Sequence, residues 1–115
     1  MHPCAVLLGE VLTLSRLEEE ALEQEDLEQA EDLAQKRSEL LQQAWKEREG
    51  YDVDLLRNTL MVVQAMQERL LELATAIHDK LGSQLKNTKQ QGKYFAGNRY
   101  LQAQSQKSYY LRKTS

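Results

Sequence analysis

The feature that most constrains this chain is a row of apolar residues in its third quarter, spaced alternately four and three residues apart. The row comprises Leu56, Leu60, Val63, Leu70, Ala74, Ile77 and Leu81, with Gln67 as its one polar member. This spacing places all eight side chains on one face of an α-helix. Since the chain has a single proline and five glycines, we expect an uninterrupted helix over about residues 53–91.

A short polar turn separates this helix from an earlier one. Gly50 suits the left-handed residue that ends many helices, and Asp52 and Asp54 follow it where carboxylates cap free backbone N–H groups. Residues 27–49 carry a second apolar face, made of Leu27, Ala30, Leu33, Ala34, Leu40, Leu41, Ala44 and Trp45. Because the connection is short, the two helices should run antiparallel.

A further apolar face predicts a helix over about residues 4–24. Its members are Leu7, Leu8, Val11, Leu12, Leu14, Leu17, Ala21 and Leu22. The same register beyond residue 24 meets only polar side chains, so we expect a break there, with Asp26 capping the next helix. Residues 1–91 are therefore predicted to form an all-α fold, an antiparallel bundle of three to four helices or a long helical hairpin.

Charge divides the chain into two parts. Residues 1–85 hold all 18 acidic residues and 8 of the 15 basic ones, a net charge of −10, whereas residues 86–115 hold the other 7 basic residues and no acid, a net charge of +7. Gly92 and Gly97 weaken helix propensity where the basic part begins. We expect residues 92–115 to form a basic, tyrosine-rich arm that packs loosely on the bundle.

The arm interleaves aromatic and basic side chains, namely Tyr94, Phe95, Tyr100, Tyr109 and Tyr110 with Lys93, Arg99, Lys107, Arg112 and Lys113. It can fold back over the acidic helices, contact another protein through its tyrosines, or stack on nucleic acid bases. The acidic body opposes the third interpretation. Folding back and protein contact are compatible with each other, and no nucleic acid partner is expected.

Residues suited to catalysis are scarce. Of the two histidines, we expect His2 to lie in a frayed terminus and His78 to be solvated on its helix. No paired cysteine, glycine-rich phosphate loop or catalytic triad spacing is present, so no enzymatic activity, cofactor or metal is expected. The lone Cys4 has no partner for an internal disulfide, which favours a reducing cytoplasm. Because Glu10 interrupts the first apolar run, we expect neither a signal peptide nor a membrane span.

Two stretches, "LTLSRLEEEALEQEDLEQAEDLAQKRSELLQQ" and "LLELATAIHDKLGSQLKNTKQQGKYFAGNRYL", cover most of the chain. In the order of their helices, in the "ALEQEDLE" junction and in the Gly-Lys and tyrosine segment after the third helix, they resemble the small flagellar type III export chaperones of the FliT and FlgN type. The total length of 115 residues also agrees with that resemblance.

The resemblance implies a cytoplasmic chaperone of flagellum biogenesis that binds a filament cap or hook-filament junction protein and delivers it to the type III secretion export apparatus. Such chaperones hold a helical segment of the client against apolar helix surface. The matching groove in this sequence is Leu56, Leu60, Val63, Leu70, Ile77 and Leu81. The resemblance associates the arm, here Tyr94, Phe95 and Tyr100, with regulation or docking. The alternative is a structural coiled-coil adaptor that forms a homodimer or larger homo-oligomer, because the same leucines can close an interface between copies.

Overall fold

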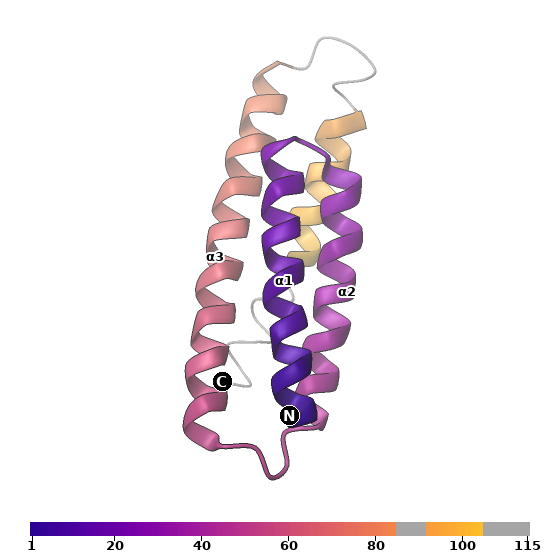
Figure 1. Cartoon of the computed structure of the whole chain (residues 1–115). Coiled ribbons are helices and arrows are strands. Elements are labelled where there is room, and N and C mark those ends of the chain that lie inside the picture. Colours follow the sequence, from indigo (N-terminus) through magenta and orange to yellow (C-terminus); the bar gives the residue numbers. More distant parts are fainter. Residues whose placement is uncertain (85–91, 105–115) are drawn as a thin grey trace.

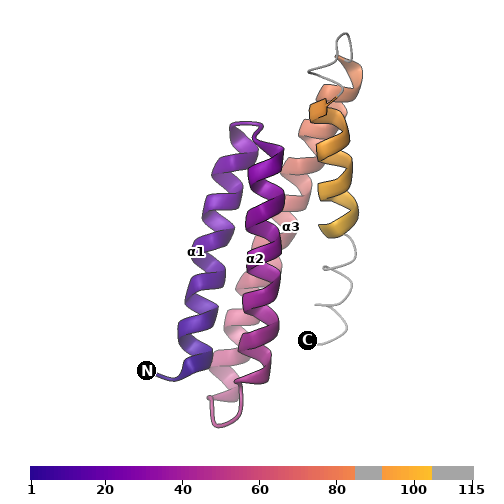
Figure 2. The same ribbon diagram turned by 90° about the vertical axis from the view of Figure 1, so that its right-hand side faces the viewer.

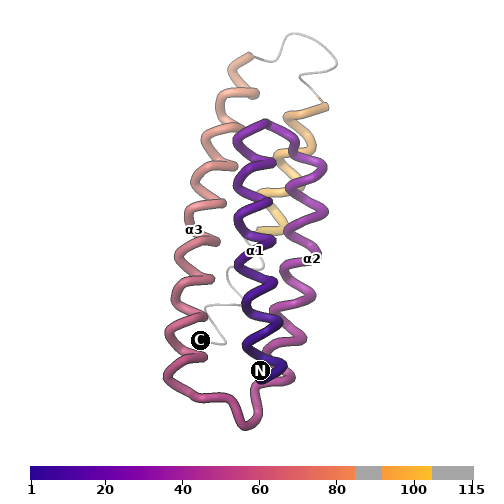
Figure 3. Tube along the Cα trace, in the orientation of Figure 1, coloured from indigo at the N-terminus to yellow at the C-terminus, as the bar shows by residue number. Residues whose placement is uncertain are grey.

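The structure is a computed structural model that describes residues 1–84 and 92–104. Helix α1 spans Pro3–Glu23, α2 spans Leu27–Lys46, α3 spans Val53–Ser83, and a fourth helix spans residues 92–104 (Figure 1). Successive helices run antiparallel along the trace (Figure 3). The predicted all-α class is confirmed. Within the described ranges, no helix is both long enough and apolar enough to cross a membrane.

The predicted break between the first two helices is confirmed. Glu25 has a φ of 58°, in the left-handed region, and its N–H donates to the carbonyl of Leu22 at 2.9 Å while that of Asp26 donates to Ala21 at 2.8 Å. These two bonds make a Schellman motif, which usually places glycine where Glu25 stands. The Asp26 carboxylate then caps α2 by accepting from the N–H of Gln29 at 3.2 Å.

The turn between α2 and α3 follows the local signals as well. Gly50 has a φ of 79°, a conformation that glycine adopts at little cost. The Asp52 carboxylate accepts hydrogen bonds from the N–H groups of Asp54 at 2.9 Å and Leu55 at 3.1 Å, which caps α3. Helix α2 ends at Lys46, three residues before the predicted end, because the turn begins earlier.

In residues 1–84 and 92–104, the helices are arranged so that the fourth helix covers only half of one side of the bundle. Helix α1 packs against both α2 and α3 along one side. The 92–104 helix lies on the opposite side of α2 and α3 (Figure 2). It starts at the end of the bundle that holds the α1–α2 turn and reaches only to about the middle (Figures 1 and 2). The whole measures 54 × 23 × 17 Å.

The apolar core has a large part near the α1–α2 turn and smaller parts toward the α2–α3 turn. The large part joins all four helices and contains Ala21, Leu22, Leu27, Ala30, Leu33, Ala34, Leu70, Ala74, Ile77, Leu81, Ala96 and Tyr100. The smaller parts are built around Cys4, Leu8 and Ala44 and around Val11 and Val63. Polar side chains occupy the middle of the bundle between these parts.

The C-terminal region departs from the sequence prediction. Helix α3 ends at Ser83 rather than at residue 91, and residues 85–91 lie outside the described part of the chain. The 92–104 helix is packed into the bundle, with Tyr100 fully buried. Residues 92–104 of the predicted arm therefore pack on the bundle, and its residues 105–115, including Tyr109 and Tyr110, lie outside the described part of the chain.

The two glycines that weaken helix propensity there are offset by tertiary contacts. A Cβ at Gly97 would lie 3.2 Å from the side chain of Leu27 on α2, so the missing side chain lets the 92–104 helix approach closely. On α3, the missing side chain of Gly82 makes the same room for the ring of Tyr94, which would lie 3.1 Å from a Cβ at that position.

Candidate helix-binding sites

The six residues predicted as a client groove divide into two groups. Val63, Leu70, Ile77 and Leu81 are buried, at most 8% exposed, because α1 and the 92–104 helix cover this part of α3. Leu56 and Leu60, nearer the α2–α3 turn, are half-buried. In this conformation the buried four have no surface to offer a partner, whereas Leu56 and Leu60 do.

A buried polar cluster of Glu18, Arg37, Gln67, Tyr100 and Gln104 connects all four helices. Arg37 Nε donates to Glu18 Oε1 at 2.9 Å, and its Nη1 donates to Gln67 Oε1 at 2.6 Å. The remaining nitrogen, Nη2, donates to Gln104 Oε1 at 2.8 Å, and the hydroxyl of Tyr100 donates to Glu18 Oε2. Each of the five side chains is at least 97% buried. The hydrogen bonds within the cluster therefore take the place of hydrogen bonds to water for the Glu18 carboxylate and the Arg37 guanidinium.

Sequence reasoning missed this cluster, although a signal was present. Glu18 falls in the register of Val11 and Leu22 on α1, and Arg37 falls in the register of Ala30 and Ala44 on α2. Gln67 is the polar member of the row on α3. Three polar residues at core positions of three helices are expected to meet, since unpaired buried charge is costly.

Tyr100 supplies a test of the cluster by pH. Burial, and then the charge of Glu18 and the hydrogen bond to it, raise the pKa of Tyr100 far above its usual value of about 10. Since the unfolded chain loses this proton near pH 10 and the folded chain keeps it, the stabilisation is complete below pH 10 and is lost as the pH rises. We expect the free energy of unfolding of the wild type to fall above pH 10 more steeply than that of Tyr100→Phe, by up to about 1.4 kcal/mol per pH unit.

Urea titrations at a series of alkaline pH values measure how steeply the free energy of unfolding falls with pH in the wild type and in Tyr100→Phe. All other residues are the same in both proteins, so the variant is a matched control for their contribution. Equal slopes above pH 10 would show that Tyr100 ionises freely in the folded chain.

The two histidines are placed differently from the sequence prediction. His2 is the N-cap of α1, where Nδ1 accepts from the N–H of Cys4 at 3.1 Å and Nε2 lies 2.9 Å from the carbonyl of Glu49. It therefore ties the start of α1 to the α2–α3 turn rather than fraying. His78 has a side chain only 18% exposed, with its ring stacked on Tyr94 at 4.5 Å between centroids.

The three aromatic residues assigned to a docking arm have unequal access. Tyr100 is buried in the polar cluster and Tyr94 is half-buried between His78 and Gly82. Phe95 is 61% exposed and meets Tyr94 edge to face, with centroids 5.9 Å apart. Of the three, Phe95 is the one whose ring is available to another molecule in this conformation.

The half of the α2–α3 side that the 92–104 helix does not reach is a first candidate site, called here the α2–α3 corner. It contains Leu41 and Trp45 on α2 and Leu56 and Leu60 on α3, all half-buried. The Arg48 guanidinium lies 4.1 Å from the centre of the Trp45 ring and shields one of its faces. Leu41, Leu56 and Leu60 pack in part against the core around Cys4, Leu8 and Ala44. The 92–104 helix does not extend to this half of the side (Figure 2).

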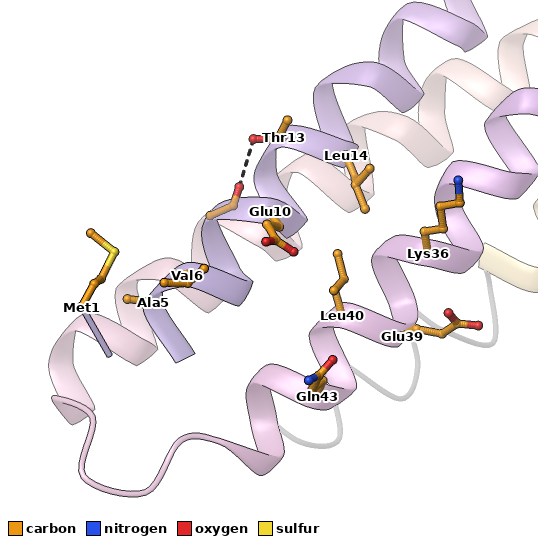
Figure 4. A pocket seen from close by; sticks show the side chains of 11 residues that line it. Met1, Ala5, Val6, Glu10, Thr13, Leu14, Lys36, Glu39, Leu40 and Gln43 are labelled. Atoms are coloured by element: carbon orange, nitrogen blue, oxygen red, sulfur yellow. Dashed lines mark hydrogen bonds between the residues drawn. The ribbon is translucent and has the colours of Figure 1, made fainter. Parts of the chain in front are cut away.

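A second candidate is an open groove between α1 and α2 of about 970 Å³, called here the α1–α2 groove (Figure 4). Its apolar members are Val6 and Leu14 on α1 and Leu40 on α2, together with Met1 and Ala5. Leu14 and Leu40 point toward each other from the two helices (Figure 4). Val6 is 43% exposed, so the apolar lining reaches solvent.

Polar side chains stand at the edges of this groove. Glu10 comes from α1, and Lys36 and Glu39 come from α2. All three are exposed, and none forms an ion pair with another residue of the described chain. An apolar surface with charged edges is suited to an amphipathic helix.

Sequence reasoning also missed the α1–α2 groove. The apolar residues of α1 extend around more of the helix than one packed face requires, since Val6 and Leu17 are both 43% exposed. Gly9 inside α1 is a second signal. Glycine destabilises a helix interior, so its presence there indicates a position where another group approaches closely.

The remaining described residues offer no further group of side chains suited to chemistry. In the described part of the chain, no three histidine, cysteine, aspartate or glutamate side chains come together as metal ligands would. Cys4 is buried, which raises the pKa of its thiol and disfavours the reactive thiolate.

No protein-family model, curated protein or solved structure matches this chain.

Proposed function

We propose that this chain is a helix-binding protein of the export-chaperone type, which holds an amphipathic segment of a client in the α1–α2 groove. The observation that carries the proposal is the groove itself, an open and mostly apolar furrow between α1 and α2. Such a furrow is the kind of surface into which an amphipathic helix lays its apolar face.

The dimensions of the groove agree with a helical ligand. Its α1 side extends from Ala5 to Leu14, about 15 Å at 1.5 Å per residue, which corresponds to a contact length of about ten helical residues. Complete burial of one valine or leucine side chain contributes about 1.5–3 kcal/mol. Since Val6, Leu14 and Leu40 are already about half-buried, covering all three supplies on the order of 2–3 kcal/mol toward binding.

From the resemblance to flagellar export chaperones we propose the client protein and the cellular location. The client is then a filament cap or hook-filament junction protein, handed to the export apparatus in the cytoplasm. Phe95, exposed on the 92–104 helix, is the aromatic residue we propose for contact with the export apparatus. The proposed groove is no longer the row on α3, since four of its six residues are buried.

The α2–α3 corner is the competing surface, because Leu56 and Leu60 remain accessible there. Trp45 lies in that corner and is the single tryptophan of the chain. A client in the corner would change its fluorescence, whereas a client in the α1–α2 groove, which Trp45 does not line, would leave it nearly unchanged.

Calorimetric titration of the full chain with synthetic C-terminal segments of cap and junction proteins tests the proposal. We expect binding to one of them, and Val6→Asp should weaken it at least about tenfold, because about 1.4 kcal/mol of apolar contact is lost. Val62→Asp is the matched control, since Val62 is 50% exposed on α3 and outside the groove.

Three outcomes would count against the proposal. Absence of binding by every segment rejects the chaperone function. Equal binding by Val6→Asp, with a change in Trp45 fluorescence, moves the site to the α2–α3 corner. Light scattering that finds a stable oligomer of the pure protein favours the structural adaptor instead.

A further inference from the structure

We infer that the α1–α2 groove takes an amphipathic helix of another protein that carries basic residues along its flanks and a small residue where it crosses Gly9. The inference rests on the proposed function, because it names the chemistry of the partner at the same surface. Charge, space and hydrogen bonding at the groove each support it.

The charged edges favour a basic partner. Glu10 on α1 and Glu39 on α2 stand on different helices beside the same apolar lining (Figure 4). Glu39 accepts one neutral hydrogen bond, from Gln35 at 3.1 Å, and neither carboxylate forms an ion pair with a cation of the described chain. Lysine or arginine on both flanks of a docked helix can pair with them.

The charge balance disfavours a second copy as the occupant. Two identical grooves facing each other would bring four carboxylates together, and residues 1–85 of each copy carry a net charge of −10. Lys36 is the exception at the edge of the groove. It lies near Glu39 on α2, so one acid or amide of the partner opposite Lys36 would set the register of the docked helix.

The space above Gly9 favours a close approach of backbones. A Cβ at Gly9 would have no neighbour within 4 Å, and the glycine is not among the described residues with positive φ. Neither packing nor backbone conformation of the single chain requires glycine there, although glycine weakens a helix. Thr13, which also lines the groove, donates its hydroxyl to the carbonyl of Gly9 at 3.1 Å.

The test uses two synthetic peptides of about 14 residues, stapled because short free helices are marginal in water. Both have the same alanine and leucine contact face, and one has lysine on its flanks where the other has glutamate. Calorimetry with the full chain should find at least about tenfold tighter binding of the lysine peptide, the equivalent of about 1.4 kcal/mol. In the double variant Glu10→Lys, Glu39→Lys the preference should reverse.

A space-filling variant tests the close approach. Gly9→Leu should weaken binding of the lysine peptide at least about tenfold, while its melting temperature stays equal to or above that of the wild type, because leucine is the better helix former. Asn58→Leu, on the exposed surface of α3 outside the groove, controls for an added leucine. A lower melting temperature of Gly9→Leu with unchanged binding of the lysine peptide would overturn the inferred close approach at Gly9.

The outcomes separate the inference from the proposed function. Equal affinity for the two peptides, or a preference that the double variant leaves unchanged, overturns the inference even if a cap or junction segment binds in a Val6-dependent way. Preference for the lysine peptide without binding of any flagellar segment supports the docking surface and rejects the export client. Self-association in the ultracentrifuge that Val6→Asp abolishes would make a second copy the occupant and would overturn the inference.

Discussion

Replacing Arg37 by alanine is expected to lower the free energy of unfolding by about 3–5 kcal/mol. The guanidinium donates to Glu18, Gln67 and Gln104 in the middle of the bundle. Without it the fully buried Glu18 carboxylate has only the hydroxyl of Tyr100 as a hydrogen-bond partner among the described residues. Small domains have a total free energy of unfolding of about 5–15 kcal/mol. This single substitution should therefore remove much of the stability of this protein.

Urea unfolding followed by circular dichroism measures this loss. Arg69→Ala is the control, since Arg69 pairs with Glu19 at the surface and its side chain is 68% exposed, so its removal should cost at most about 1 kcal/mol. The double variant Glu18→Leu, Arg37→Met should lose less than Arg37→Ala, because no lone charge remains buried. A loss below about 1 kcal/mol for Arg37→Ala would mean that water reaches the cluster.

Tyr100→Ala is expected to lower the free energy of unfolding by about 3–5 kcal/mol as well. The ring is fully buried in the large part of the core, and its hydroxyl donates to Glu18. Truncation leaves a cavity between α1 and the 92–104 helix and removes a hydrogen bond to a buried charge. The effect would be small if residues 92–104 were only a loose arm.

Phe95→Ala is the matched control on the same helix, since Phe95 is 61% exposed. We expect its free energy of unfolding to lie within about 0.5 kcal/mol of the wild type. Similar small losses for the two variants would place the 92–104 helix outside the cooperative unit. Native-state hydrogen exchange locates the effect, because Tyr100→Ala should expose the amides of residues 92–104 first.

The helices and their ends were predictable because the signals for them are local. The apolar row on α3 follows the helical repeat, and hydrogen bonds of Asp26 and Asp52 to N–H groups three residues away or fewer start α2 and α3. Gly50 marks the α2–α3 turn by its φ of 79°. Such features depend on neighbours in sequence, so composition and spacing are sufficient to find them.

The end of α1 shows where local reasoning becomes weaker. The Schellman motif there uses Glu25 in the left-handed region instead of glycine, so no glycine announces it. The Glu25 carboxylate accepts from Lys80 on α3 at 3.0 Å, a contact with a residue 55 positions away. The change of apolar phase predicted the break, while the conformation that makes it depends on the folded bundle.

The sequence by itself determined that this protein is helical, where its first three helices begin, and which faces they bury, because helix periodicity and capping act over a few residues. Only the tertiary structure decided that residues 92–104 belong to the bundle, that Glu18 and Arg37 pair at its centre, and that an apolar groove stays open between α1 and α2. Each of these three features depends on which helices pack against each other. That choice is made by contacts between residues far apart in the chain, which the pattern of any one helix does not contain.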